Sequence, residues 1–298
     1  MKGTIISSFV VVAALLTSTI SAFADDLNDV LTNGELRHIG IRYANFVTGS
    51  GDGFDVELAQ GFAHHLGVRY QYVDSSFSTV IRDLLGQDVV RNGTDVTLDG
   101  AYPVKGDMIA AGFTILPWRE RVLLYSKPTF PSQVLLIARA ESATIPIHGS
   151  AVIDRDIAET KGLIGRQTLL VMRKTCLDPS SYGLSEPNFA IREYTRSTNL
   201  NEMVPALLDG SADFTLLDVP DVLLDVQKWA GRIKIIGPIS GEQRMGAAFR
   251  PTGTKLRDAF NEYLVEIKAD GSYDRLVLKY YPEIRSYFPE FFGGAREK

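Results

Sequence analysis

The chain has 298 residues, of which 45% are apolar and 22% are charged, a composition typical of a globular protein with a sizeable core. Its 31 basic and 36 acidic residues give a formal charge of −5 at pH 7, and the acidic excess is spread along the chain. Because the sequence has no basic tract, we expect no nucleic-acid partner.

The first 24 residues have the pattern of an export signal. Lys2 precedes an apolar run over about residues 5–22, and Ala22-Phe23-Ala24 has the small residues of a cleavage site. A membrane anchor needs about 20 apolar residues, and serine and threonine interrupt this run too often for one. We therefore predict cleavage after Ala24 and a periplasmic location.

The sequence offers little for metal or redox chemistry. Cys176 is the only cysteine, so the chain forms no internal disulfide, and we interpret it as a small, half-buried residue rather than a nucleophile. His64 and His65 are adjacent on a predicted helix, whereas metal ligands on a helix are more often four residues apart. We expect neither a metal nor a cofactor.

In the first half of the chain, predicted strands and helices alternate. Phe54, Leu58 and Phe62 recur every four residues on a helix that Gly67 ends. The other predicted elements are strands over residues 35–42, 68–73 and 108–111, and a helix over residues 80–85. Residues 89–104 interrupt this order, and their turn pairs Asn92-Gly93 and Asp99-Gly100 indicate a small hairpin to which the sequence assigns no role.

Residues 106–138 have a layout suited to binding an anion. A buried strand leads to a turn over residues 112–114, and Pro117 then fits the first turn of a short helix that carries Arg119. Backbone N–H groups at the turn and the guanidinium of Arg119 could hold one carboxylate from two sides. An apolar strand over residues 134–137 then leads into the second half of the chain.

The second half repeats the alternation of strands and helices. We expect a short strand that ends at residue 165, after which Thr168 opens a helix. A strand over residues 213–217 places Asp218 at its carboxyl end. The remaining predictions are strands over residues 190–194, 233–236 and 246–249, helices over 200–208, 256–267 and 272–280, and an aromatic tail that packs on the surface. This order predicts an α/β fold with mostly parallel sheets flanked by helices.

Four stretches together resemble the bacterial periplasmic solute-binding proteins for polar amino acids (family 3). They are GFDVELAQGFAHHLGV (residues 53–68), GDMIAAGFTILPWRERVLLYSKP (106–128), GSADFTLLDVPDVL (210–223) and IKADGSYDRLVLKYY (267–281). The resemblance implies two lobes joined by two crossing strands, with lobe 1 formed by residues 25–131 and 244–298 and lobe 2 by residues 132–243. The same stretches also resemble the binding-protein-like module of some membrane-bound lytic transglycosylases, and residues 89–104 are not typical of the family.

The resemblance also implies a set of ligand-binding residues. Arg119 matches the arginine that takes the carboxylate of the ligand, and Asp218 matches the aspartate that takes its α-ammonium. Gly112 and Thr114 match the turn that contacts the ligand. Tyr43, Phe46 and Phe77 match the aromatics around the ligand. Thr168 falls near a helix start of lobe 2 that supplies further N–H contacts. Arg119 could instead form an exposed ion pair, Asp218 could only cap a helix, and each aromatic could be a core residue.

The family implies a monomeric, non-enzymatic receptor of an ABC-type importer that closes over a small amino-acid-like ligand and delivers it to an inner-membrane permease. One alternative is a periplasmic enzyme on the same fold, similar to cyclohexadienyl or arogenate dehydratases, for which Glu193 and Asp218 are the candidate acids or bases. Another is an accessory protein that binds a cell-wall fragment or serves a cofactor system.

Overall fold

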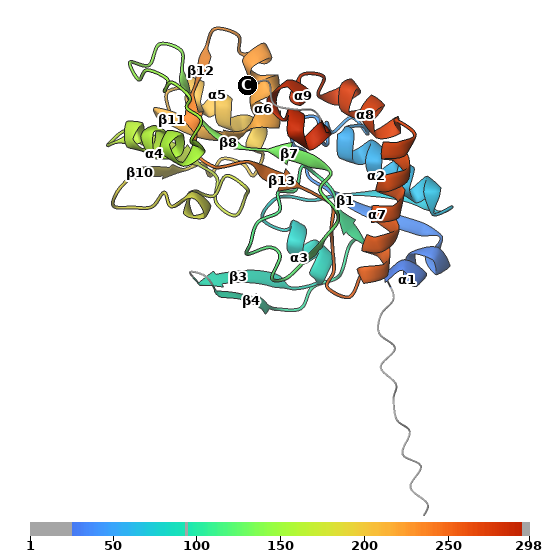
Figure 1. Ribbon diagram of the computed structural model, residues 1–298. Helices are drawn as coiled ribbons and strands as arrows, with labels where there is room; N and C mark the ends of the chain where they lie inside the picture. Colours follow the sequence, from blue (N-terminus) through green and yellow to red (C-terminus); the bar gives the residue numbers. More distant parts are fainter. Residues whose placement is uncertain (1–25, 93–94, 294–298) are drawn as a thin grey trace, which may run out of the picture.

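Two five-stranded sheets form the centres of two lobes. The computed structural model describes residues 26–92 and 95–293, so the predicted export signal lies outside the described residues. In Figure 1 the elements of the second sheet gather at the upper left, and those of the first lie to the right and below. The predicted two-lobed α/β fold is therefore confirmed.

The first sheet has the strand order β2-β1-β5-β14-β6. These strands are Arg69–Asp74, Glu35–Gly40, Met108–Ile109, Ala248–Phe249 and Leu124–Tyr125. β1 pairs in parallel with β2 and β5, whereas β14 is antiparallel to both β5 and β6. The helices of this lobe are α1 (Asp26–Asn33), α2 (Phe54–His65), α3 (Val80–Leu85), α7 (Thr254–Ala269) and α8 (Ser272–Tyr280).

The second sheet has the order β10-β9-β11-β8-β12 and repeats this mixture. Its strands are Ala190–Glu193, Thr168–Val171, Phe214–Asp218, Val134–Arg139 and Ile233–Pro238. β9 is parallel to β10 and β11, and β8 is antiparallel to β11 and β12. Its helices are α4 (Ile153–Ile164), α5 (Met203–Leu208) and α6 (Val219–Lys228), with 3-10 turns Pro179–Tyr182 and Leu200–Glu202.

Two antiparallel strands run between the lobes. They are β7 (Phe130–Ser132) and β13 (Gln243–Met245), which pair with each other, and Figure 1 shows them crossing from one lobe to the other. Residues 88–99 form the predicted hairpin, with β3 (Asp88–Asn92) antiparallel to β4 (Asp95–Asp99). After α8, the last described elements are α9 (Ile284–Tyr287) and the 3-10 turn Pro289–Phe292.

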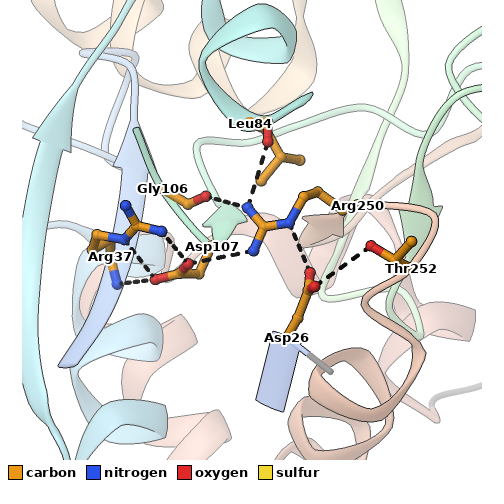
Figure 2. A network of polar contacts seen from close by, with 7 residues as sticks. All are labelled: Asp26, Arg37, Leu84, Gly106, Asp107, Arg250 and Thr252. Atoms are coloured by element: carbon orange, nitrogen blue, oxygen red, sulfur yellow. Dashed lines mark hydrogen bonds and ion pairs between the residues drawn. The ribbon is translucent and has the colours of Figure 1, made fainter. Parts of the chain in front are cut away.

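Arg250 joins distant parts of the first lobe through a network that Figure 2 shows. Its Nε lies 2.8 Å from a carboxylate oxygen of Asp26 in α1, and its Nη1 donates to the carbonyl oxygen of Gly106 at 2.6 Å. Its Nη2 lies 3.4 Å from Asp107, which also pairs with Arg37 at 2.7 Å. Because both carboxylates are almost fully buried, this guanidinium ties α1 and β5 to the segment that follows β14.

Three predicted elements are wrong. Residues 117–122 form consecutive turns instead of a short helix, because β6 begins at Leu124 and leaves too little chain for a helix to propagate. The segment before residue 165 is the end of helix α4, not a strand, and Thr168 begins strand β9 rather than a helix. Among the described residues, no helix is long and apolar enough to cross a membrane.

Candidate functional site

Arg119 is the largest side chain that the first lobe buries almost completely. Only 1% of it is exposed, and its Nη1 donates to the backbone carbonyl of Thr114 at 2.9 Å. Its guanidinium carbon lies 4.0 Å from the centroid of the Phe113 ring, a distance at which an aromatic face stabilises a cation. Its Nε and the hydroxyl of Thr114 are both buried and have no hydrogen-bond partner.

Asp218 is the corresponding buried charge of the second lobe. It ends β11 and begins α6 as the N-cap residue, although its side chain makes no capping hydrogen bond. Instead, its carboxylate accepts hydrogen bonds from Tyr43 at 3.0 Å, from Cys176 at 3.0 Å and from Ser132 at 3.2 Å. These donors come from lobe 1, from lobe 2 and from the crossing strand β7, so Asp218 lies where all three meet.

The charge of Arg119 acts on the carboxyl group of Asp218. Burial raises the pKa of Asp218, and its three hydrogen bonds and the positive charge of Arg119 act in the opposite direction. Burial and then the charge of Asp218 raise the pKa values of Tyr43 and Cys176 well above their usual range. The phenol and thiol therefore stay protonated and serve as donors to Asp218.

Several contacts join the lobes around this centre. Tyr43 follows β1 in lobe 1, so its hydrogen bond to Asp218 crosses between lobes. Beside it, the backbone N–H of Ala44 donates to the side chain of Asn201 at 3.1 Å. Phe77 is buried against Tyr43, with ring centroids 5.6 Å apart in an edge-to-face arrangement. The structure thus brings Tyr43 and Phe77 to Asp218, and Thr114 to Arg119.

Phe46 and Gly112 lie behind the site, in the core of lobe 1. The ring of Phe46 packs within 5.1 Å of the Phe130 and Tyr281 rings, centroid to centroid. Gly112 has a φ of 59°, and a Cβ there would meet the Phe46 ring at 2.5 Å. Its N–H donates to Asp55 at 2.5 Å, so this group serves the lobe itself. We infer that these two residues position the site.

Asp55 is a buried carboxyl group close to the site. It lies on α2, and burial raises its pKa to about 7, although the hydrogen bond from Gly112 acts to lower it. Asp221, in the first turn of α6, is also buried, and its Oδ2 has no partner. Burial and then the charge of Asp225 raise the pKa of Asp221 well above its usual range.

Thr168 lies away from this centre. Its N–H donates to Asp213, just before β11 begins, whereas Asp218 ends that strand. Five strand residues span roughly 16 Å, so Thr168 lies at the other end of the sheet. The expectation that Thr168 lies at a helix start beside the ligand was wrong, because the segment is a strand.

Cys176 contacts Asp218 from the same lobe, although the sequence analysis gave it no role in the site. It lies in the turn after β9, fully buried rather than half-buried, with its thiol on Asp218. The apolar run over residues 168–171 could have indicated a strand that Cys176 follows. Side chains after the carboxyl ends of parallel strands gather at one edge of a sheet, so Cys176 could then have been expected near Asp218. Glu193, by contrast, is exposed and pairs with Arg173 at 3.3 Å.

Within residues 26–92 and 95–293, no three or more His, Cys, Asp or Glu side chains are grouped so that they could hold a metal ion.

Comparisons with known proteins agree with this architecture. The model of the bacterial extracellular solute-binding proteins, family 3, matches residues 89–283. A crystal structure of the P235GK mutant of ArgBP from T. maritima is 25% identical, covers 87% of this chain and 100% of that chain, and has a TM-score of 0.68. The ancestral amino acid-binding protein AncCDT-1, a precursor of cyclohexadienyl dehydratase, has the same fold, with a TM-score of 0.66, 22% identity and the same coverage.

Two curated relatives carry this module within a longer chain. Membrane-bound lytic murein transglycosylase F of Desulfosudis oleivorans is 28% identical over 236 residues, which are 79% of this chain and 45% of the relative. The protein of the same name from Alcanivorax borkumensis is 25% identical over 236 residues, 79% of this chain and 44% of that one. The chain thus spans about half the length of these relatives. Both parts of the resemblance predicted from the sequence are confirmed.

Proposed function

Because the chain belongs to the bacterial extracellular solute-binding proteins, family 3, we propose that it captures a small amino-acid-like ligand between its lobes. The observation that carries the proposal is that lobe 1 buries a cation, Arg119, whose charge acts on Asp218, an anion that lobe 2 buries. A free amino acid presents the opposite charges on neighbouring atoms. Such a ligand bridges the lobes and stabilises their closed arrangement.

Arg119 is the group we assign to the ligand carboxylate. Its guanidinium has donors spaced for a carboxylate, which a lysine ammonium lacks, and its Nε is buried without an acceptor. The unpartnered hydroxyl of Thr114 adds a second donor beside it. Binding therefore satisfies two polar atoms that otherwise remain buried and unpaired.

Asp218 is the group we assign to the ligand ammonium. Tyr43 and Cys176 already donate to one of its oxygens, and Ser132 donates to the other. An ammonium must share this carboxylate with them or displace one, and Tyr43 is the donor from the other lobe. Tyr43 and Phe77 then form the aromatic wall of the site.

The cellular role we propose is delivery of the ligand, without catalysis, to an inner-membrane permease of an ABC-type importer. In this proposal the protein is a periplasmic monomer, with residues 1–24 removed, lobe 1 formed by residues 25–131 and 244–298, and lobe 2 by residues 132–243. The crossing strands β7 and β13 lie at the two passages between lobes, and we propose that the lobes close about them.

Calorimetric titration of unfolded and refolded, ligand-free protein against a panel of amino acids tests the proposal. The panel includes arginine, because the arginine-bound form of truncated ArgBP from T. maritima has a similar fold. We expect one member to bind, and Arg119→Ala or Asp218→Ala to weaken its binding by about 2–5 kcal/mol, because the partner charge stays buried and unpaired. The proposal fails if no member binds, or if neither variant changes the affinity.

An enzyme on the same fold is the second candidate. Similarity to AncCDT-1 supports it, as does Asp221, a buried carboxyl group that its raised pKa keeps protonated close to Asp218. Incubating the protein with prephenate or arogenate and measuring product decides for or against this candidate. Loss of turnover in Asp221→Asn, with binding retained, would assign the proton donor.

A cell-wall fragment is the third candidate, because both curated relatives are named as murein transglycosylases. Titration with soluble muropeptides tests it. Tighter binding of a muropeptide than of any free amino acid would favour this candidate over an amino-acid receptor.

A further inference from the structure

The hairpin of β3 and β4 has two chemically different faces. Side chains alternate along a strand, and directly opposed residues share a face, so the pairs Val89–Leu98 and Arg91–Val96 lie on one side. Val89 and Val96 pack against the core, so this side faces the body of the protein. The acidic residues of the hairpin lie on the opposite side: Asp88, Asp95 and Asp99.

Arg91 is the one cation on the inward face of the described hairpin strands, and it packs on Trp118, the residue before Arg119. Its guanidinium carbon lies 4.7 Å from the centroid of the Trp118 ring. The guanidinium carbon of Arg119 lies 5.3 Å from the same ring. The hairpin thus places a second guanidinium on the indole next to the residue that we assign to the ligand carboxylate.

One side-chain nitrogen of each of these three residues has no acceptor. The Nε atoms of Arg91 and Arg119 and the Nε1 atom of Trp118 are all buried without a hydrogen-bond partner. Among the residues that the structure describes, neither arginine forms an ion pair with a carboxylate. Two cations on one indole repel each other, and a buried donor without an acceptor is destabilising, so the cluster is suited to an anion.

We propose that Arg91 binds a second anionic group of the ligand, a carboxylate, while Arg119 binds the first. The ligand is then a small acidic amino acid of the size of glutamate or aspartate. This inference rests on the proposed function and adds the class of ligand to it. If Arg91 only packed its guanidinium on Trp118, its removal would change the affinities for an acidic amino acid and for the corresponding amide equally. The ratio of these two affinities can be measured.

The test compares glutamate with glutamine, which has the same shape but lacks the second charge. Ligand-free protein is titrated calorimetrically with glutamate, aspartate, glutamine, asparagine and arginine, and the same titrations are repeated with Arg91→Ala and Arg91→Gln. The matched control is Arg232→Ala, which removes a guanidinium lying 5.9 Å from a different indole, Trp229, in the second lobe. Thermal unfolding followed by circular dichroism verifies that each variant is folded.

We expect an acidic amino acid to bind the unmodified protein most tightly. Both Arg91 variants should weaken its binding about 10- to 100-fold and that of its amide by less than about threefold, with no change in Arg232→Ala. Equal or tighter binding of an amide or arginine, or an equal loss for acid and amide in the Arg91 variants, overturns the inference but leaves the receptor proposal standing. Binding of none of these five amino acids overturns the inference, whereas the receptor proposal falls only if the other amino acids do not bind either.

Discussion

Changing Tyr43 to phenylalanine removes one hydroxyl group from the contact between the lobes. That hydroxyl donates to Asp218 at 3.0 Å, and both side chains are fully buried. A hydrogen bond to a charged acceptor contributes about 1.5–3 kcal/mol. In the proposed closing motion this bond forms only when the lobes are closed, so its loss should raise the open population by about 10- to 150-fold.

The single cysteine allows this opening to be measured. Cys176 is the only thiol of the chain and is fully buried beside Asp218, so a thiol reagent reaches it only after the lobes separate or the protein unfolds. When closing is faster than the reaction, the labelling rate is proportional to the open population. Tyr43→Phe should therefore be labelled faster by the same 10- to 150-fold factor.

A matched control separates opening from a general loss of stability. Tyr273→Phe removes another buried hydroxyl, one that donates to the carbonyl of Thr129 within lobe 1 at 2.6 Å. Its labelling rate at Cys176 should stay close to that of the unmodified protein. Measuring both variants over a series of low urea concentrations shows whether labelling requires global unfolding. Equal rates for Tyr43→Phe and Tyr273→Phe would refute the assignment of Tyr43 as a contact that holds the lobes together.

Three further changes have expected outcomes. Arg250→Ala should lower the free energy of unfolding in urea by about 3–5 kcal/mol because it leaves the buried carboxylate of Asp26 without its cation, while Asp107 keeps Arg37. A change no larger than that of Arg257→Ala, at an exposed ion pair, would contradict this. Burial raises the pKa of Asp55 from 3.8 to about 7, so the folded state holds this proton more tightly than the unfolded state does. The stability that the protonated carboxyl group contributes is complete below about pH 4 and is lost as the pH rises to 7. Asp55→Asn keeps an acceptor for Gly112 and should remove at most about 4 kcal/mol of this pH dependence. Urea unfolding at pH 4 and pH 8 measures the difference. An unchanged dependence of the unfolding free energy on pH would contradict the prediction. Arg119→Lys should weaken ligand binding more than about tenfold with little change in melting temperature, and calorimetry showing unchanged affinity would argue against paired donors.

Elements with a strong local pattern could be predicted from the sequence. The helices α2, α3, α7 and α8 have apolar residues at helical spacing or clear stops, and the structure places them within a few residues of the expected positions. The strand that ends at Asp218 was predictable because it is a short apolar run between turn residues. The mixed direction of the sheets was not, because pairing depends on contacts between distant segments.

Helix α4 shows why the second lobe was harder to interpret. Its buried residues are Asp156, Thr160 and Ile164, so the face that it buries is largely polar and gives no apolar period. Because the sequence analysis did not predict this helix, it also assigned the wrong structure to the next strand and to the turn that carries Cys176. The site itself joins Tyr43 to Asp218, 175 positions apart, and no local pattern encodes such a contact.

The position of β14 in the first sheet has a consequence for how the protein is made. β14 lies between β5 and β6, yet it is synthesised more than 120 residues after them. All strands of the second sheet have been synthesised once Pro238 is added, whereas the first sheet still lacks an interior strand and the arginine that pairs with Asp26. The first sheet therefore cannot be completed before the last fifth of the polypeptide has been made.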